Sequence, residues 1–164
     1  MIYLGIGSNL PSEAFGAPIA NCRVAAGRLA EAGFRIAAQS RFYETAPVPR
    51  SDQPWYVNCV VGVESDLTPQ AALAACLGVE AAMGRVRSVR NAARTVDIDL
   101  LIWHDLALNE PDLVLPHPRL HERAFVLLPL ADIAPDWRHP VLGTAIADLI
   151  ARLPPDQEIR PIKA

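Results

Sequence analysis

The sequence contains few cysteines and no cysteine motif. Cys22, Cys59 and Cys76 are isolated, odd in number and without CxxC spacing. This pattern excludes a disulfide framework and gives no zinc site. We therefore expect three small buried side chains in a protein of a reducing compartment.

Export and membrane signals are also lacking. The opening residues MIYLGIG lack the basic segment, apolar stretch and small-residue cleavage site of a signal peptide. No apolar run reaches the ~20 residues that a membrane helix needs. These absences predict a cytoplasmic protein with no membrane partner.

Positive charge is scarce and of one kind. The net charge is −3, which disfavours nucleic-acid binding by bulk electrostatics. Lys163 is the one lysine, so arginine must bind any buried anion. The 164 residues, 51% of them hydrophobic, are enough for one domain with its own core. We expect a single domain over residues 1–164, with its core at about 1–135 and a C-terminal helix and tail at 136–164.

Hydrophobic periodicity and turn residues predict the order of elements. Strands are expected at residues 1–7, 34–43, 56–64 and 95–103, and helices at 17–32 and 68–83. Further helices are expected near 121–132 and 143–152, followed by a frayed Pro-rich tail. This βαββαβ order indicates a ferredoxin-like α+β fold: an antiparallel sheet with helices on one face and extra C-terminal helices.

The sharpest local signal lies in the last core strand. Side chains alternate along a strand, so Asp97 and Asp99 share one face and Ile98 lies on the other. Paired carboxylates repel each other unless a cation lies between them, and oxygen ligands favour Mg²⁺. A solvated sheet face with two acids is the alternative.

The segment before this strand is rich in arginine. Arg85, Arg87, Arg90 and Arg94 lie within ten residues that contain no acid. Guanidinium groups next to a carboxylate pair suit a polyphosphate bridged by Mg²⁺. An exposed basic loop balanced by the two acids is the alternative. The sequence contains neither a P-loop nor a complete dinucleotide fingerprint, so ATP would have to bind in another way.

Two further patterns point to small-molecule binding. Tyr56 and Asn58 share a strand face, and an aromatic plane beside an amide suits a flat heterocycle, although ordinary packing is the alternative. His117 lies between Pro116 and Pro118 and could bind a phosphate or a ribose. A lone histidine is nevertheless more often structural.

Several segments together resemble one known family. They are Gly7-Ser8-Asn9-Leu10, Phe42-Tyr43-Glu44-Thr45, Gln53 to Asn58, Gly84-Arg85-Val86-Arg87, Arg94 to Leu100, and Pro116-His117-Pro118-Arg119 through Phe125. In this order and spacing they resemble 6-hydroxymethyl-7,8-dihydropterin pyrophosphokinase over residues 2–135. The chain differs from the family pattern at Ala92-Ala93, where Gly-Pro is usual, at Ala46, where Pro is common, and at Leu77, where some members are polar.

The resemblance implies a reaction and a set of site residues. ATP and the pterin alcohol would give AMP and a diphosphate ester in folate synthesis, by attack at the β-phosphorus, in a monomer. Asp97 and Asp99 would hold two Mg²⁺ ions and act in catalysis with Arg85 and Arg94. ATP would contact Arg85, Arg87, Arg94, Leu100, His117 and Arg123. The pterin would contact Gly7, Thr45, Ala46, Val48, Tyr56, Asn58 and Phe125.

Two other functions compete with this one. A non-catalytic ferredoxin-like domain that senses a nucleotide or pterin explains the fold, but it has no need for paired aspartates beside four arginines. A ferredoxin-like RNA-binding module needs aromatic and basic side chains over the sheet. Asp97 and Asp99 put negative charge on that face instead.

Overall fold

The structure, a computed structural model, describes residues 1–47, 52–84 and 96–163. Its elements follow in the order β1 (Ile2–Ser8), α1 (Pro18–Glu31), β2 (Arg35–Gln39), β3 (Tyr43–Thr45), β4 (Tyr56–Glu64), α2 (Pro69–Ala82), β5 (Asp97–Trp103), β6 (Leu108–Glu110), β7 (Leu113–Leu115), a 3₁₀ turn (Leu120–Glu122), α3 (Ala124–Ile133), α4 (Ile146–Ala151) and β8 (Ile159–Pro161). In the described ranges, none of the helices is both long and apolar enough to cross a bilayer.

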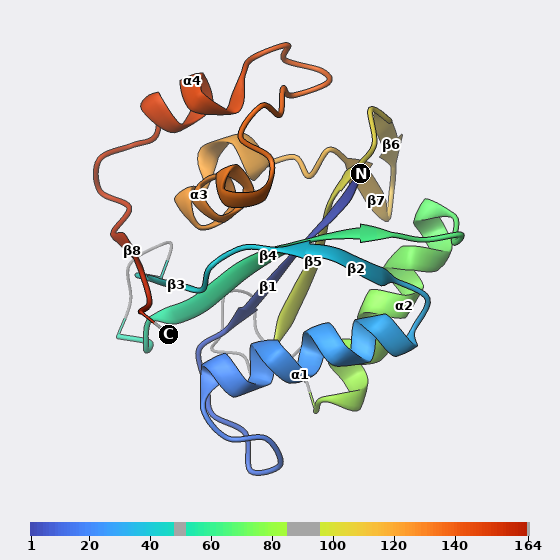
Figure 1. The fold of residues 1–164 in the computed structure, drawn as a ribbon, viewed down its shortest axis with the longest axis vertical. Coiled ribbons are helices and arrows are strands. Elements are labelled where there is room, and N and C mark those ends of the chain that lie inside the picture. The colour runs from blue at the N-terminus through green and yellow to red at the C-terminus, as the bar shows by residue number, and fades with distance from the viewer. Residues whose placement is uncertain (48–51, 85–95, 164) are drawn as a thin grey trace.

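One antiparallel sheet forms the centre of the molecule (Figure 1). Its order is β5-β1-β4-β3-β8, and β2 pairs with the same edge of β4 as β3 does. The α+β class and the antiparallel sheet are therefore confirmed.

The single strand expected at residues 34–43 is wrong, because the chain forms two strands there. Between β2 and β3, the Ser40 hydroxyl accepts the backbone N–H of Val60 at 2.9 Å. The Ser40 N–H donates to the Val60 carbonyl at 2.9 Å. The Ser40 hydroxyl thus takes the place of a backbone carbonyl as the partner of the Val60 N–H. The strand is interrupted at Ser40, but the chain stays hydrogen-bonded to β4.

The two long helices begin and end where the sequence predicts. Pro18 occupies the first turn of α1, and Gly33 just beyond its end has φ +111°. The Thr68 hydroxyl caps α2 by accepting the Ala71 N–H at 3.1 Å. Gly84, with φ +87°, follows the end of α2.

Helices cover both faces of the sheet, and α1 and α2 share one of them (Figure 1). Leu4, Ile6 and Ile98 point into the core under these two helices. The C-terminal helices α3 and α4 lie on the opposite face, where Val60 and Leu127 are fully buried. The expectation of helices on one face thus holds for α1 and α2, and the extra helices cover the other.

The three cysteines are free and buried, as expected. Burial raises the pKa of Cys59 to about 12 and that of Cys76, helped by the nearby Glu80 and Asp99 charges, to about 12. These thiols act as core side chains.

The C-terminal tail is not frayed, which corrects the expectation for this segment. β8 pairs antiparallel with β3, so that Thr45 lies opposite Ile159. The Ile162 N–H donates to the Phe42 carbonyl at 2.8 Å. The tail therefore extends the sheet at its β3 edge (Figure 1).

Candidate active site

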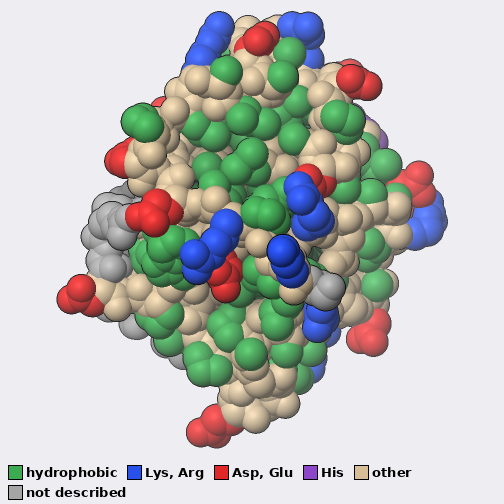
Figure 2. All heavy atoms as spheres, turned by 60° about the vertical axis from the view of Figure 1, so that its left-hand side comes forward, with side chains coloured by type: hydrophobic (Ala, Val, Ile, Leu, Met, Phe, Trp, Pro, Cys, Tyr) green, Lys and Arg blue, Asp and Glu red, His purple; other side chains and the backbone are tan. Residues whose placement is uncertain are grey.

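A cavity of about 990 Å³ opens on the face that carries α3 and α4. It lies at the end of the sheet where β1 ends and β4 and β5 begin. Nine residues predicted for the site line it: Gly7, Thr45, Ala46, Tyr56, Asn58, Asp97, Asp99, Arg123 and Phe125. In Figure 2, basic side chains gather near the middle of the face shown, with acidic and hydrophobic side chains beside them.

The floor of the cavity is a row of residues across neighbouring strands. Gly7 of β1 lies opposite Asp97 of β5 on one side and Asn58 of β4 on the other. A Cβ atom on Gly7 would lie 2.6 Å from Oδ1 of Asn58. The missing side chain lets the Asn58 amide lie close against the backbone of β1.

The amide of Asn58 is fixed on one side by its neighbour. Its Nδ2 donates to Oγ1 of Thr45 at 2.6 Å, and Asn58 is only 7% exposed. Since one donor is taken by Thr45, the rest of the amide can pair with the edge of a heterocycle. Tyr56, two residues earlier on the same face, supplies a half-buried aromatic plane.

The paired aspartates lie on one face of β5, as the alternation predicted. Both are half-buried and line the cavity, whereas Ile98 and Leu100 point into the core on the other side. The Ile98 N–H donates to Oε2 of Glu80 at 2.7 Å. Glu80 belongs to α2 and is only 1% exposed. Its carboxylate therefore fixes the backbone of β5 between the two aspartates.

The pair fits Mg²⁺ by its chemistry. Both groups are carboxylates on one wall of one cavity, and Mg²⁺ is typically held by one or two carboxylates together with water and substrate phosphates. Within the described part of the chain, no group of three His, Cys, Asp or Glu side chains could hold a metal ion. An all-protein metal cage is therefore not seen there.

Arg123 and Phe125 come from the beginning of α3. The guanidinium of Arg123 lies over the Phe125 ring, 5.3 Å from its centroid. The pKa of Arg123 is lowered, because burial outweighs the opposing effect of the nearby Asp99 charge. A cation and an aromatic ring thus line the same cavity as the two aspartates.

His117 lies beside this cavity rather than among its lining residues. Its backbone N–H donates to the Leu101 carbonyl at 2.8 Å, and its ring Nδ1 accepts the backbone N–H of Arg119 at 3.2 Å. Burial lowers the pKa of His117 to about 4, with Arg123 acting in the same direction and Asp97 opposing it. His117 is therefore neutral at physiological pH, and its contact with ATP stays a prediction.

Of the remaining predicted residues, the structure describes Leu100. The Leu100 side chain is buried in the core beneath α1 and α2, so only its backbone remains available to a nucleotide. Arg85, Arg87, Arg94 and Val48 lie outside the described residues. Their predicted contacts stay predictions.

Other lining residues were not predicted as site residues. They include Gln53, Arg119, Glu122, Asp156 and Gln157. Gln53 and Arg119 belong to segments that carry the family resemblance, so those segments could have indicated them. No sequence signal marks Asp156 or Gln157, which reach the cavity because the tail folds back along β3.

An α+β fold that places paired carboxylates, an arginine and an aromatic–amide slot around one cavity defines an enzyme of the small-molecule transferase class. The sequence model of one family, described as 7,8-dihydro-6-hydroxymethylpterin-pyrophosphokinase (HPPK), matches residues 3–135. The chain belongs to this family and is a pyrophosphokinase.

Curated relatives agree with this family. A 2-amino-4-hydroxy-6-hydroxymethyldihydropteridine pyrophosphokinase of Methylorubrum extorquens is 42% identical over 154 residues, which are 93% of each chain. One of Pseudomonas aeruginosa is 39% identical over 93% of this chain and 91% of its own. The folic acid synthesis protein fol1 of Pneumocystis carinii is 34% identical over 98% of this chain, which spans 21% of that longer protein.

Solved structures agree on the fold. The HPPK-DHPS of Plasmodium falciparum has a TM-score of 0.69 at 17% identity, covering 92% of this chain and 44% of its own. Another HPPK-DHPS, crystallised in complex with substrates, has a TM-score of 0.71 at 16% identity and covers 92% of this chain and 42% of its own.

Proposed function

We propose that this chain transfers pyrophosphate from ATP to 6-hydroxymethyl-7,8-dihydropterin, giving AMP and the pterin diphosphate in folate synthesis. The observation that carries the proposal is the single cavity that holds both Asp97 and Asn58, on either side of Gly7. A heterocycle that is hydrogen-bonded to Asn58 would have its substituent within reach of the Asp97 and Asp99 carboxylates. Membership of the HPPK family supports the same reaction.

The pterin ring would lie between Tyr56 and Phe125. Both rings line the cavity, and they come from different elements, one from β4 and the other from α3. Asn58, with backbone groups near Thr45, Ala46 and Val48, would pair with the amide edge of the ring. Stacking plus paired hydrogen bonds would select a flat, polar heterocycle.

Asp97 and Asp99 would hold two Mg²⁺ ions. When bound, magnesium supplies charge neutralisation for the phosphates and lowers the pKa of the substrate hydroxyl. The chain's own part is to orient the two carboxylates, and the hydrogen bond from Ile98 to Glu80 supports this.

ATP would be held mainly by arginine. Arg123 already lies on the cavity wall, and Arg85, Arg87 and Arg94 are proposed to join it on the phosphates. His117 would contact the nucleotide as a neutral ring, and Leu100 through its backbone. Arg85 and Arg94 would neutralise the charge that develops during transfer.

The finer structural assignments are part of the same proposal. The order β5-β1-β4 followed by β2 and β3 supports a ferredoxin-like βαββαβ topology. We propose one domain over residues 1–164, with the catalytic core in about 1–135, acting as a monomer. Three free, buried cysteines support a cytoplasmic location.

The test is incubation of the purified protein with ATP, Mg²⁺ and the hydroxymethyl dihydropterin. AMP release that requires the pterin is the expected result. ATP binding with no AMP release would overturn the proposal and favour a sensing domain.

A matched pair of variants tests the site. Asp97→Asn is expected to keep its fold and lower the turnover number by roughly a thousandfold, because charge stabilisation in the transition state is lost. Asp105→Asn, at an exposed position just beyond β5, should leave turnover unchanged. Near-wild-type turnover in Asp97→Asn contradicts the assignment of the metal site.

A further inference from the structure

Gln157 of the C-terminal tail makes two hydrogen bonds to the chain that leads into α3. Its Oε1 accepts the Ala124 N–H at 2.8 Å, and its Nε2 donates to the Glu122 carbonyl at 2.7 Å. One side-chain amide therefore hydrogen-bonds to the backbone on both sides of Arg123. Gln157 also lines the cavity itself.

The beginning of α3 needs such a partner. The first N–H groups of a helix have no partner within the helix, and a side chain at the N-cap usually satisfies one of them. The N-cap of α3 is Arg123, which makes no side-chain capping bond. The amide of Gln157, 33 residues away in sequence, takes that place at Ala124.

The next tail residue is attached to the opposite wall. The Glu158 carbonyl accepts the Ala46 N–H at 3.1 Å, and β8 then pairs with β3. Arg160 strengthens this attachment: its Nε donates to Glu44 at 2.7 Å, and its guanidinium lies 5.0 Å from the Trp55 ring centroid. Consecutive residues, Gln157 and Glu158, thus join α3 to β3.

The two walls joined in this way are the two sides of the substrate slot. The α3 side carries Arg123 and Phe125, and the β3 side carries Thr45 and Ala46. A shift of α3 away from β3 would widen the slot and move the Phe125 ring from its place over the floor. The tail therefore helps to hold the two sides of the slot together at the end where α3 begins.

We propose that Gln157 is a positioning residue of the pterin slot, acting through the backbone of Glu122 and Ala124 to place Phe125 and Arg123 opposite β3. The proposal rests on the proposed function, because it assigns the slot to the pterin. It adds a role for the tail, which lies beyond the family match at residues 3–135.

The experiment compares three variants by pterin fluorescence titration and steady-state kinetics. Gln157→Met removes both hydrogen bonds at similar length. Gln157→Glu keeps an acceptor for the Ala124 N–H and loses the donor. Gln70→Met is the matched control, because Gln70 also hydrogen-bonds through its side chain, to Glu110 on the exposed surface away from the cavity.

Gln157→Met is expected to raise the pterin Kd about tenfold, as the loss of paired hydrogen bonds to a wall of the slot would do. The KM for pterin should rise more than the KM for ATP. Gln157→Glu should recover part of the loss, and Gln70→Met should bind like the wild type.

The outcomes separate the two proposals. A pterin Kd within twofold of wild type in Gln157→Met, with AMP release intact, overturns the role of Gln157 alone. A lower melting temperature with equal KM changes for both substrates also overturns it, since that pattern reflects stability only. A wild-type protein that binds no pterin overturns both. If Gln157→Met does not fold, Gln157→Asn, whose shorter amide cannot reach both backbone groups, is judged by the same criteria.

Discussion

Gly7 shows how a single missing side chain can shape a binding slot. Its neighbours across the sheet are Asn58 and Asp97, and the Asn58 amide occupies the space that a Gly7 side chain would fill. Gly27, in contrast, lies in the middle of α1, where an added Cβ meets nothing within 4 Å. The two glycines therefore respond in opposite ways to the same substitution.

Gly7→Ala is expected to raise the pterin Kd at least about tenfold, because the new methyl group must displace the Asn58 amide. Gly27→Ala should leave binding unchanged and stabilise the fold by about 0.5–1 kcal/mol. Fluorescence titration and urea unfolding measure the two effects. Wild-type affinity in Gly7→Ala means that Asn58 does not read the pterin.

Residue-level prediction from sequence succeeded where a face was fixed by alternation. Asp97 and Asp99 were placed correctly because Ile98 and Leu100 had to enter the core. The same rule fails beyond them, since a register shift in the pairing of β1 with β5 puts both Leu101 and Ile102 in the core under α3 and α4. Such a bulge depends on the partner strand, which local sequence does not describe.

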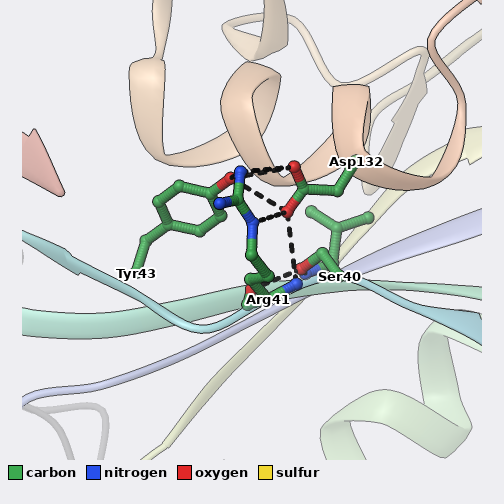
Figure 3. Close-up of polar contacts among 5 residues, drawn as sticks. Ser40, Arg41, Tyr43 and Asp132 are labelled. Atoms are coloured by element: carbon green, nitrogen blue, oxygen red, sulfur yellow. Dashed lines mark hydrogen bonds and ion pairs between the residues drawn. The ribbon is translucent and has the colours of Figure 1, made fainter. Parts of the chain in front are cut away.

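At the scale of elements, a polar cluster at Asp132 also ties α3 to the sheet, apart from the tail (Figure 3). The Tyr43 hydroxyl donates to Oδ1 of Asp132 at 2.9 Å, and Nη2 of Arg41 donates to the same oxygen at 3.0 Å. Burial alone would raise the pKa of Asp132, but the hydrogen bonds from Arg41 and Tyr43 outweigh it and hold the pKa below its ordinary 3.8. The charged carboxylate is therefore the form that the fold prefers.

Asp132→Ala is expected to lower the free energy of unfolding by about 1–2 kcal/mol at neutral pH, because the buried Tyr43 loses its carboxylate acceptor. A group with a lowered folded pKa stabilises above its unfolded pKa and loses that contribution as pH falls through the folded value. The difference between wild type and variant should therefore shrink below about pH 4.

Urea unfolding at pH 7 and pH 3 measures this difference. Glu64→Ala is the matched control, because it removes the exposed pair between Arg35 and Glu64 and should change stability little. An Asp132→Ala protein as stable as wild type at pH 7 would mean that the Asp132 cluster does not stabilise the packing of α3 on the sheet.

Long elements were predictable and short ones were not. α1, α2 and β4 are long enough for hydrophobic periodicity to predict them, and their bounds agree with the predicted ranges. β8 has three residues, two of them Arg160 and Pro161, and no internal pattern. It exists because β3 offers it an edge, which is a property of the folded sheet.

At the scale of the whole molecule, the cavity lies where α3 and α4 leave one face of the sheet uncovered. α3 and α4 cover the part of this face around Val60, and the end of the sheet that carries Gly7 and Asp97 remains open. Residues from β1, β3, β4, β5, α3 and the tail meet there. A ligand in this cavity therefore contacts most of the fold, and its binding free energy adds to global stability.

This linkage gives a test of metal dependence that needs no turnover. ATP with Mg²⁺, at a hundred times its Kd, should raise the melting temperature by about 5–10 °C for a domain of this size. Chelation of the metal by EDTA should abolish most of the shift, and so should Asp97→Asn, because the carboxylates would then lack the cation that bridges them to the phosphates. Asp105→Asn should retain the full shift. Differential scanning fluorimetry of the four samples measures this directly. A shift that survives EDTA means that arginine alone binds the nucleotide, and Asp97 and Asp99 would then need another explanation than a metal site.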